Sequence, residues 1–409
     1  MLVLFLLVLA APVVNSSQKR PPARVNSNED NLQWETARKG IEKNGEHITS
    51  AMWALTHGYS SRARMDEAMR LLLVFLEAIS KNDPEKLRPI GGLEGFFSRY
   101  LKLLRSDDDM VAGFSARVLA VTAGSRYEPQ ILALLQQRDA SFTDEWAYPS
   151  KVARGNAAFA LSINGSDKHK PQIAQLLKSM NEYDRSGAVH ALGRLKAMEY
   201  AGEIAALLLR KEFTFRRSES PIYALVKMGV AAQFKKEIGQ ALEEDYDSEV
   251  QEAAAFALAH VRAIEYAPKI AGFLEDDYRR SWAAKVLALL GAKEFAPQIA
   301  RIAFGADWLD RSAALLSLGI LRAENYAPQI SSLMKSKDLA VSYDAALSLA
   351  LMGGAGYEKE ILARLSTNKT GKYVDEGELH PLVAEEAREI DERVRAALQL
   401  FRSGKAPGS

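Results

Sequence analysis

The sequence predicts an all-α fold, an α-α superhelical solenoid of about eight helix pairs with helical caps at its ends. The first observation is a five-residue phrase with an aromatic ring or an imidazole at its first position and Ile at its fifth. Eight copies begin 42, 31, 34, 32, 29, 31 and 31 residues apart, a period typical of helix-pair repeats. The second is an Ala- and Leu-rich composition with few alternating apolar and polar runs, which favours helices over strands.

The phrase marks the start of the second helix in each predicted pair. Its copies are Tyr127–Ile131, His169–Ile173, Tyr200–Ile204, Phe234–Ile238, Tyr266–Ile270, Phe295–Ile299, Tyr326–Ile330 and Tyr357–Ile361. Five of the eight copies carry Pro at the third position, where its fixed φ and missing donor suit the first helical turn. The Ile and the residue four positions later lie one turn apart on one face, which predicts a buried stripe.

The first helix of each pair is predicted from the residues that precede the phrase. An apolar residue stands eight positions before it, and a residue that is usually small stands twelve positions before it. Small residues allow neighbouring helices to approach to about 8 to 10 Å. We expect aspartates near the start of this helix to cap its free amides; they are Asp184, Asp247, Asp277, Asp307 and Asp310.

The clearest repeat, Asp310–Ala323 followed by Tyr326–Leu333, resembles HEAT repeats, in particular the short phycobilisome-lyase-like class. The resemblance covers roughly residues 106–366 and implies stacked helix pairs, but it implies little about function. In HEAT repeats an Arg commonly pairs with an Asp across units. The Arg residues at the matching position are Arg154, Arg185, Arg280 and Arg311. Other residues replace Arg in other units, so we do not expect a continuous ladder.

The chain divides into five predicted parts. They are a signal peptide at 1–16, a polar linker at 17–31, an N-terminal helical cap at 32–105, the HEAT-like repeat solenoid at 106–366, and a C-terminal helix and tail at 367–409. The apolar run Leu2–Val14 is too short to span a bilayer, and small residues near Val14–Ser17 suit a signal peptidase. We therefore expect an extracytoplasmic protein, secreted or periplasmic, with no transmembrane segment.

Charge and composition argue against several classes of function. The 53 basic and 52 acidic side chains give a net charge of +1, which argues against nucleic-acid binding. Cysteine is absent, which excludes disulfides and thiolate metal sites. The six histidines have no ligand spacing, and neither a Gly-rich phosphate loop nor a Gly-x-Ser-x-Gly elbow occurs. We therefore predict no catalytic, cofactor-binding or metal-binding residue.

Aromatic residues recur once per unit in the loops between successive helix pairs, with Arg beside them. The candidate partner-binding residues are Trp146, Tyr148, Phe215, Tyr246, Tyr278, Arg279 and Trp308. Aromatic and Arg side chains are common anchors of interfaces. The alternative is that each aromatic packs onto the first turn of its own helix as a hydrophobic staple. The longest spacing adds residues near 141–151, which suggests a functional loop on one face.

Three functions remain open from the sequence. The leading interpretation is an exported, non-enzymatic HEAT-repeat scaffold that presents a concave helical surface to a protein partner. A second is a module that binds a glycan or another polymer through the loop aromatics. A third, implied only by the resemblance, is a lyase-like enzyme of the bilin-lyase repeat class, for which the chain offers no nominated acid, base or nucleophile.

Overall fold

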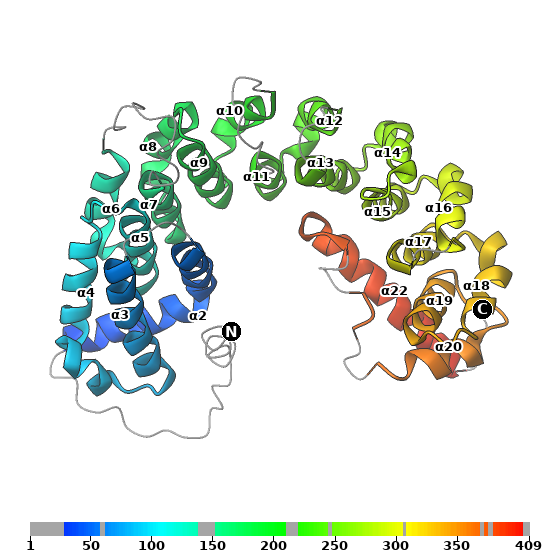
Figure 1. Ribbon diagram of the computed structural model, residues 1–409, viewed down its shortest axis with the longest axis horizontal. Coiled ribbons are helices and arrows are strands. Elements are labelled where there is room, and N and C mark those ends of the chain that lie inside the picture. Colours follow the sequence, from blue (N-terminus) through cyan, green and yellow to red (C-terminus); the bar gives the residue numbers. More distant parts are fainter. Residues whose placement is uncertain are drawn as a thin grey trace. The chain divides into compact units, whose positions relative to one another are not determined.

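The computed structural model describes residues 28–57, 62–137, 152–209, 220–243, 248–305, 308–368, 372–374 and 379–403. Every regular element in these ranges is a helix (Figure 1), so the predicted all-α class is confirmed. The predicted signal peptide and most of the polar linker lie outside the described residues. None of the described helices is long and apolar enough to cross a membrane.

The chain forms two compact units, Met1–Ile204 and Ala205–Ser409, and each is considered by itself. The helices of unit 1 are α2 (Asn28–His57), α3 (Arg62–Ser80), α4 (Gly92–Leu103), α5 (Asp109–Ala123), α6 (Glu128–Leu135), α7 (Ala153–Ile163), α8 (Lys170–Gln175) and α9 (Glu182–Arg194). The boundary between the units falls inside α10 (Ala201–Ala206). The repeat pairs α5–α6 and α7–α8 stack in order, and α9 packs on α7.

Unit 2 continues the same pairing. Its helices are α11 (Ser220–Met228), α12 (Lys235–Glu243), α13 (Ser248–His260), α14 (Ala267–Gly272), α15 (Arg280–Leu290), α16 (Ala296–Ala303), α17 (Trp308–Leu321), α18 (Ala327–Leu333), α19 (Leu339–Leu351), α20 (Glu358–Leu365) and α22 (Ala384–Ser403). The first helices α13, α15, α17 and α19 form one row, and the second helices form the other (Figure 1). This arrangement confirms the HEAT-like repeat predicted from the sequence.

The repeated phrase begins the second helix, as predicted. In several units the aromatic residue ends a short 3-10 turn, as Tyr200 does in Met198–Tyr200, and the α-helix starts at the next residue. The phrase Ile has no exposed surface in any unit; these residues are Ile131, Ile173, Ile204, Ile238, Ile270, Ile299, Ile330 and Ile361. Within each unit, an apolar side chain that recurs at each repeat therefore contributes to the core of the stack.

The first helices pack through the small residues predicted from the sequence. The residue twelve positions before the phrase is fully buried in all eight units, including Ala188 and Ala283. In unit 1 the contact reaches the backbone, because a Cβ on Gly155 of α7 would overlap the carbonyl oxygen of Tyr183. A Cβ on Gly187 of α9 would overlap the backbone of Gly155. Helices α7 and α9 therefore approach closely only because both positions are glycine.

The cap prediction was wrong for two aspartates. Asp184 lies in the first turn of α9 and Asp310 in that of α17, and both are buried inside the stack. Each pairs with the Arg of the preceding unit, at 3.4 Å from Asp184 Oδ2 to Arg154 Nε and 3.6 Å from Asp310 Oδ2 to Arg280 Nε. Among the described residues, the side chains of Asp108, Asn181 and Asp338 cap first helices.

The other three aspartates predicted as caps are Asp247, Asp277 and Asp307. Asp277 precedes α15 and forms an ion pair with Arg280, whereas Asp247 and Asp307 lie outside the described residues. The carboxylate that accepts backbone amides before α15 is that of Asp276. Whether an aspartate lies before a helix, where it can cap, or inside its first turn, where it can face a neighbouring helix, depends on the helix start. The sequence does not fix that start to one residue.

Helix α2 contacts both α5 and α9 in unit 1. A Cβ on Gly40 would overlap the carbonyl oxygen of Val121 in α5, so the two helices touch at the backbone. Arg194 of α9 donates hydrogen bonds to Asn44 Oδ1 at 2.9 Å and His47 Nε2 at 2.8 Å. Helix α2 therefore lies across the first helices of unit 1, while α4 packs against α5.

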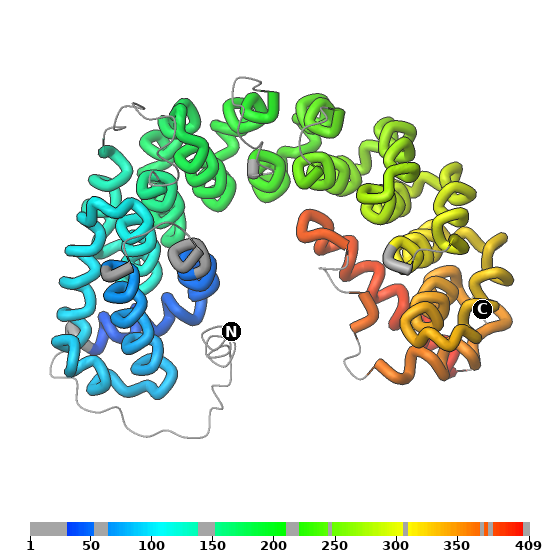
Figure 2. The backbone as a smooth tube through the Cα atoms, in the orientation of Figure 1, coloured from blue at the N-terminus to red at the C-terminus, as the bar shows by residue number. Residues whose placement is uncertain are grey.

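Helix α22 has the corresponding position in unit 2. It packs on α19 and α20, and the short segment before it reaches α13. Figure 2 shows it on the side of the first helices rather than stacked beyond the last pair. In both units, part of the first-helix face is thus occupied by the chain's own terminal helix.

Candidate partner-binding edge

The structure describes part of the predicted loop edge. Tyr278 and Arg279 are described, and Trp308 is the first residue of α17, although its side chain is outside the described part. The other four predicted residues lie outside the described residues; they are Trp146, Tyr148, Phe215 and Tyr246. The site is therefore built around the loop between α14 and α15.

Tyr278 stands at the tip of this loop with 93% of its surface exposed. Its backbone amide donates to Asp276 Oδ1 at 2.9 Å, and the amide of Arg279 donates to the same oxygen at 3.1 Å. This Asx turn fixes the loop backbone while it directs the tyrosine to solvent. Tyr278 therefore does not pack onto α15 as a staple, and its role at a partner edge stays a prediction.

Arg279 has a different environment from its neighbour. Its Nη1 lies 3.3 Å from Asp276 Oδ2, and its guanidinium carbon lies 5.6 Å from the ring centroid of Phe273. The Phe273 ring in turn packs on Trp282 of α15, with 5.1 Å between centroids. Arg279 thus holds the loop against its own unit, and it is less available to a partner than Tyr278.

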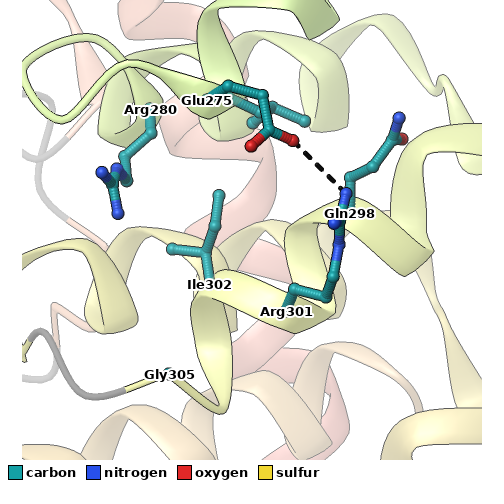
Figure 3. Close-up of a pocket in the computed structure, with 7 residues that line it drawn as sticks. Glu275, Arg280, Gln298, Arg301, Ile302 and Gly305 are labelled. Atoms are coloured by element: carbon teal, nitrogen blue, oxygen red, sulfur yellow. Dashed lines mark hydrogen bonds and ion pairs between the residues drawn. The ribbon is translucent and has the colours of Figure 1, made fainter.

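A groove of about 200 Å³ lies beside this loop, between α16 and the loop that enters α15 (Figure 3). Its lining residues are Leu274, Glu275, Arg280, Gln298, Arg301, Ile302 and Gly305. Arg301 Nη2 and Glu275 Oε1 are 3.3 Å apart and link the two walls. Leu274 and Ile302 supply apolar surface, while the amide and the guanidinium groups supply donors.

The groove was not predicted from the sequence. Its walls come from two successive helix pairs of unit 2, and Glu275 and Arg301 meet only after these pairs stack. A weak signal existed at the fourth position of the phrase, because Gln298 of α16 is only half-buried beside Ile299, which has no exposed surface. The arrangement can hold a chain that offers an apolar side chain together with carboxylate or amide groups.

Other inter-unit loops also expose apolar side chains. In unit 2, Leu339 at the start of α19 is 73% exposed. In unit 1, Met180 is 66% exposed in the loop that enters α9. Large apolar side chains on a surface are ordinary when they are single, but these lie close to the start of a first helix, as Tyr278 does. Among the described residues, no group of three or more metal-ligating side chains occurs.

Comparisons with known proteins give similarity of fold. No protein-family model and no curated protein matches the chain. Among solved structures, the complex of CpcE and CpcF of phycocyanin lyase from Nostoc sp. PCC7120 is 21% identical, with a TM-score of 0.33, covering 66% of this chain and 94% of that chain. An engineered protein is 17% identical, with a TM-score of 0.44, covering 87% of this chain and 99% of that chain.

Proposed function

We propose that the protein is an exported, non-enzymatic scaffold that binds a protein partner along the loops between successive repeat units. The observation that carries the proposal is the 93% exposed side chain of Tyr278, fixed on a rigid turn beside the Glu275–Arg301 groove. An exposed aromatic ring next to an apolar and guanidinium-lined groove has the composition of an interface anchor.

The chain's own helices already cover part of the surface formed by the first helices of the pairs, which supports the choice of the loop edge. Helix α2 lies across the first helices in unit 1, and α22 lies on those of unit 2. A partner that approached either face would compete with buried contacts of the chain itself. In the part of the chain that the structure describes, no helix covers Tyr278, so we place the partner there rather than on the concave surface expected from the sequence.

The export part of the proposal rests on the sequence of the first residues. The apolar run Leu2–Val14 and the small residues after it have the features of a cleaved signal. Mass spectrometry of the native protein should find a chain that begins near residue 17. A chain that retains Met1 would contradict export and leave the binding proposal to be tested in the cell interior.

The binding part is tested by replacing Tyr278 with Ala. We expect capture of a partner from the extracytoplasmic fraction to weaken by about 2 kcal/mol, or roughly 30-fold, because a hot-spot aromatic is removed. The melting temperature should stay unchanged, since the side chain buries almost no surface. Ile264→Ala is the matched control: Ile264 is 46% exposed in the same unit, but in the turn between paired helices. Equal capture by both variants would contradict the proposed edge.

A further inference from the structure

A short segment before α22, Leu379–Val383, fastens the start of this helix to the first helices of unit 2. Leu379, Leu382 and Val383 are buried, with at most 7% of their surface exposed. The imidazole of His380 stacks on Phe256 of α13, with 4.4 Å between ring centroids and 7° between planes. Its Nε2 lies 3.3 Å from the hydroxyl of Tyr223 in α11. One imidazole thus joins the segment to two different helices.

The hydrogen bonds of His380 require a neutral ring. The backbone amide of Leu382 donates to Nδ1 at 3.3 Å, so that nitrogen carries no proton. The proton of the neutral ring is therefore on Nε2, from which it can donate to the Tyr223 hydroxyl. A second proton on Nδ1 would face the Leu382 N–H and break the cap of the turn Pro381–Val383.

Among the described residues, the charged groups around His380 do not offset a positive charge on it. Lys285 of α15 is the cation that acts on it, and Glu386 of α22 is engaged by His260 of α13 at 2.9 Å. Burial, and then the charge of Lys285, lowers the pKa of His380 to about 4. Glu252 of α13 interacts with the same lysine, and burial raises its pKa. Protonation of His380 is therefore opposed while the segment is docked.

We propose that Leu379–Val383 is a pH-gated latch, which holds the start of α22 on α11 and α13 while His380 is neutral and releases it when His380 is protonated. Release uncovers Tyr223 and Phe256, two aromatic side chains on the first-helix face of unit 2. The rest of α22 stays in place, because Ala387, Val394 and Leu398 are buried against the stack.

The direction of the pH effect follows from proton linkage. An exposed histidine has a pKa near 6.5, whereas the docked one titrates near 4. Between these values the released state binds more protons, so acid favours release. The ratio of released to docked latch should therefore rise by up to about tenfold for each pH unit between about 6.5 and 4, and it should be constant above about 6.5.

Hydrogen exchange of the full chain tests the latch between pH 7.5 and 4.5, after correction for the intrinsic rate. Protection of residues 379–384, which include the Leu382 amide, should fall below pH 6.5. His380→Asn keeps a side-chain acceptor for that amide and does not titrate, so its protection should not change with pH. His260→Gln is the matched control, since it removes the other imidazole that faces α22 but should keep the wild-type response.

Three outcomes would overturn the latch. One is a His380→Asn variant that loses protection over the same pH range as the wild type. Another is loss of protection in α17 at the same pH as in residues 379–384, which would indicate acid unfolding of the whole unit. The third is independent of any variant: the His380 C2–H resonance of the wild type should titrate well below pH 6.5, and a midpoint at or above 6.5 would refute the mechanism.

Discussion

At the scale of single residues, the close contact between α7 and α9 depends on the absence of a side chain. Gly155→Ala should destabilise the protein by about 1 to 3 kcal/mol, because the added methyl group meets the backbone of Tyr183, which cannot rotate away. Gly202→Ala in α10 is the matched control, since no atom lies within 4 Å of the added Cβ. It should be neutral or stabilise the helix by about 0.5 to 1 kcal/mol. Similar denaturation midpoints for the two variants would contradict the proposed helix contact.

Residue positions that follow the repeat were predictable from the sequence, and those that depend on a neighbour were not. Ile299 is buried as predicted because it recurs at a fixed place in each helix pair. Asp184 was expected to cap α9, yet it is buried and faces Arg154 of the preceding unit. Tyr278 was predicted as an edge residue without a decision between partner contact and staple. The Asx turn of Asp276 that holds its backbone recurs at the same position in other repeats, so the turn alone did not decide between the two.

At the scale of helices, the Arg154–Asp184 pair couples α7 to α9. Asp184 is fully buried, and it also accepts a hydrogen bond from Ser179 Oγ at 3.0 Å. Arg154→Met should cost about 3 kcal/mol of unfolding free energy, since it removes a cation that faces a buried carboxylate. Arg301→Met is the control, because the Arg301–Glu275 pair lies in an exposed position and should contribute at most about 1 kcal/mol. A cost for Arg154→Met no larger than the control would show that the pair is not a structural link.

The terminal helices show where prediction from the sequence stops. Their presence was predicted, since α3 at Arg62–Ser80 lies in the predicted N-terminal helical cap and α22 at Ala384–Ser403 lies in the predicted C-terminal helix and tail. Their docking did not, because it depends on single contacts between distant residues. Arg194 meets Asn44 across 150 positions of sequence, and His380 meets Tyr223 across 157. Neither contact recurs from repeat to repeat, so no periodic pattern in the sequence predicts it.

At the scale of the whole molecule, stability in a repeat array comes from interfaces between neighbours. Within each unit, second helices pack on the first helix of the following pair, as α6 does on α7 and α16 does on α17. A substitution in one helix pair should therefore destabilise the neighbouring helices more than remote ones. This property distinguishes an array from a domain with a single core.

Ile299→Ala tests this property in unit 2. The substitution leaves a cavity at a position with no exposed surface, so it should cost about 2 to 5 kcal/mol. Gln298→Ala, one residue earlier on the side of the groove, should change the stability little. Native-state hydrogen exchange of Ile299→Ala should show reduced protection in α15, α16 and α17, while α5 and α7 in unit 1 keep theirs. An equal loss of protection in both units would mean that the chain unfolds as one cooperative body, and nearest-neighbour coupling would then not describe it.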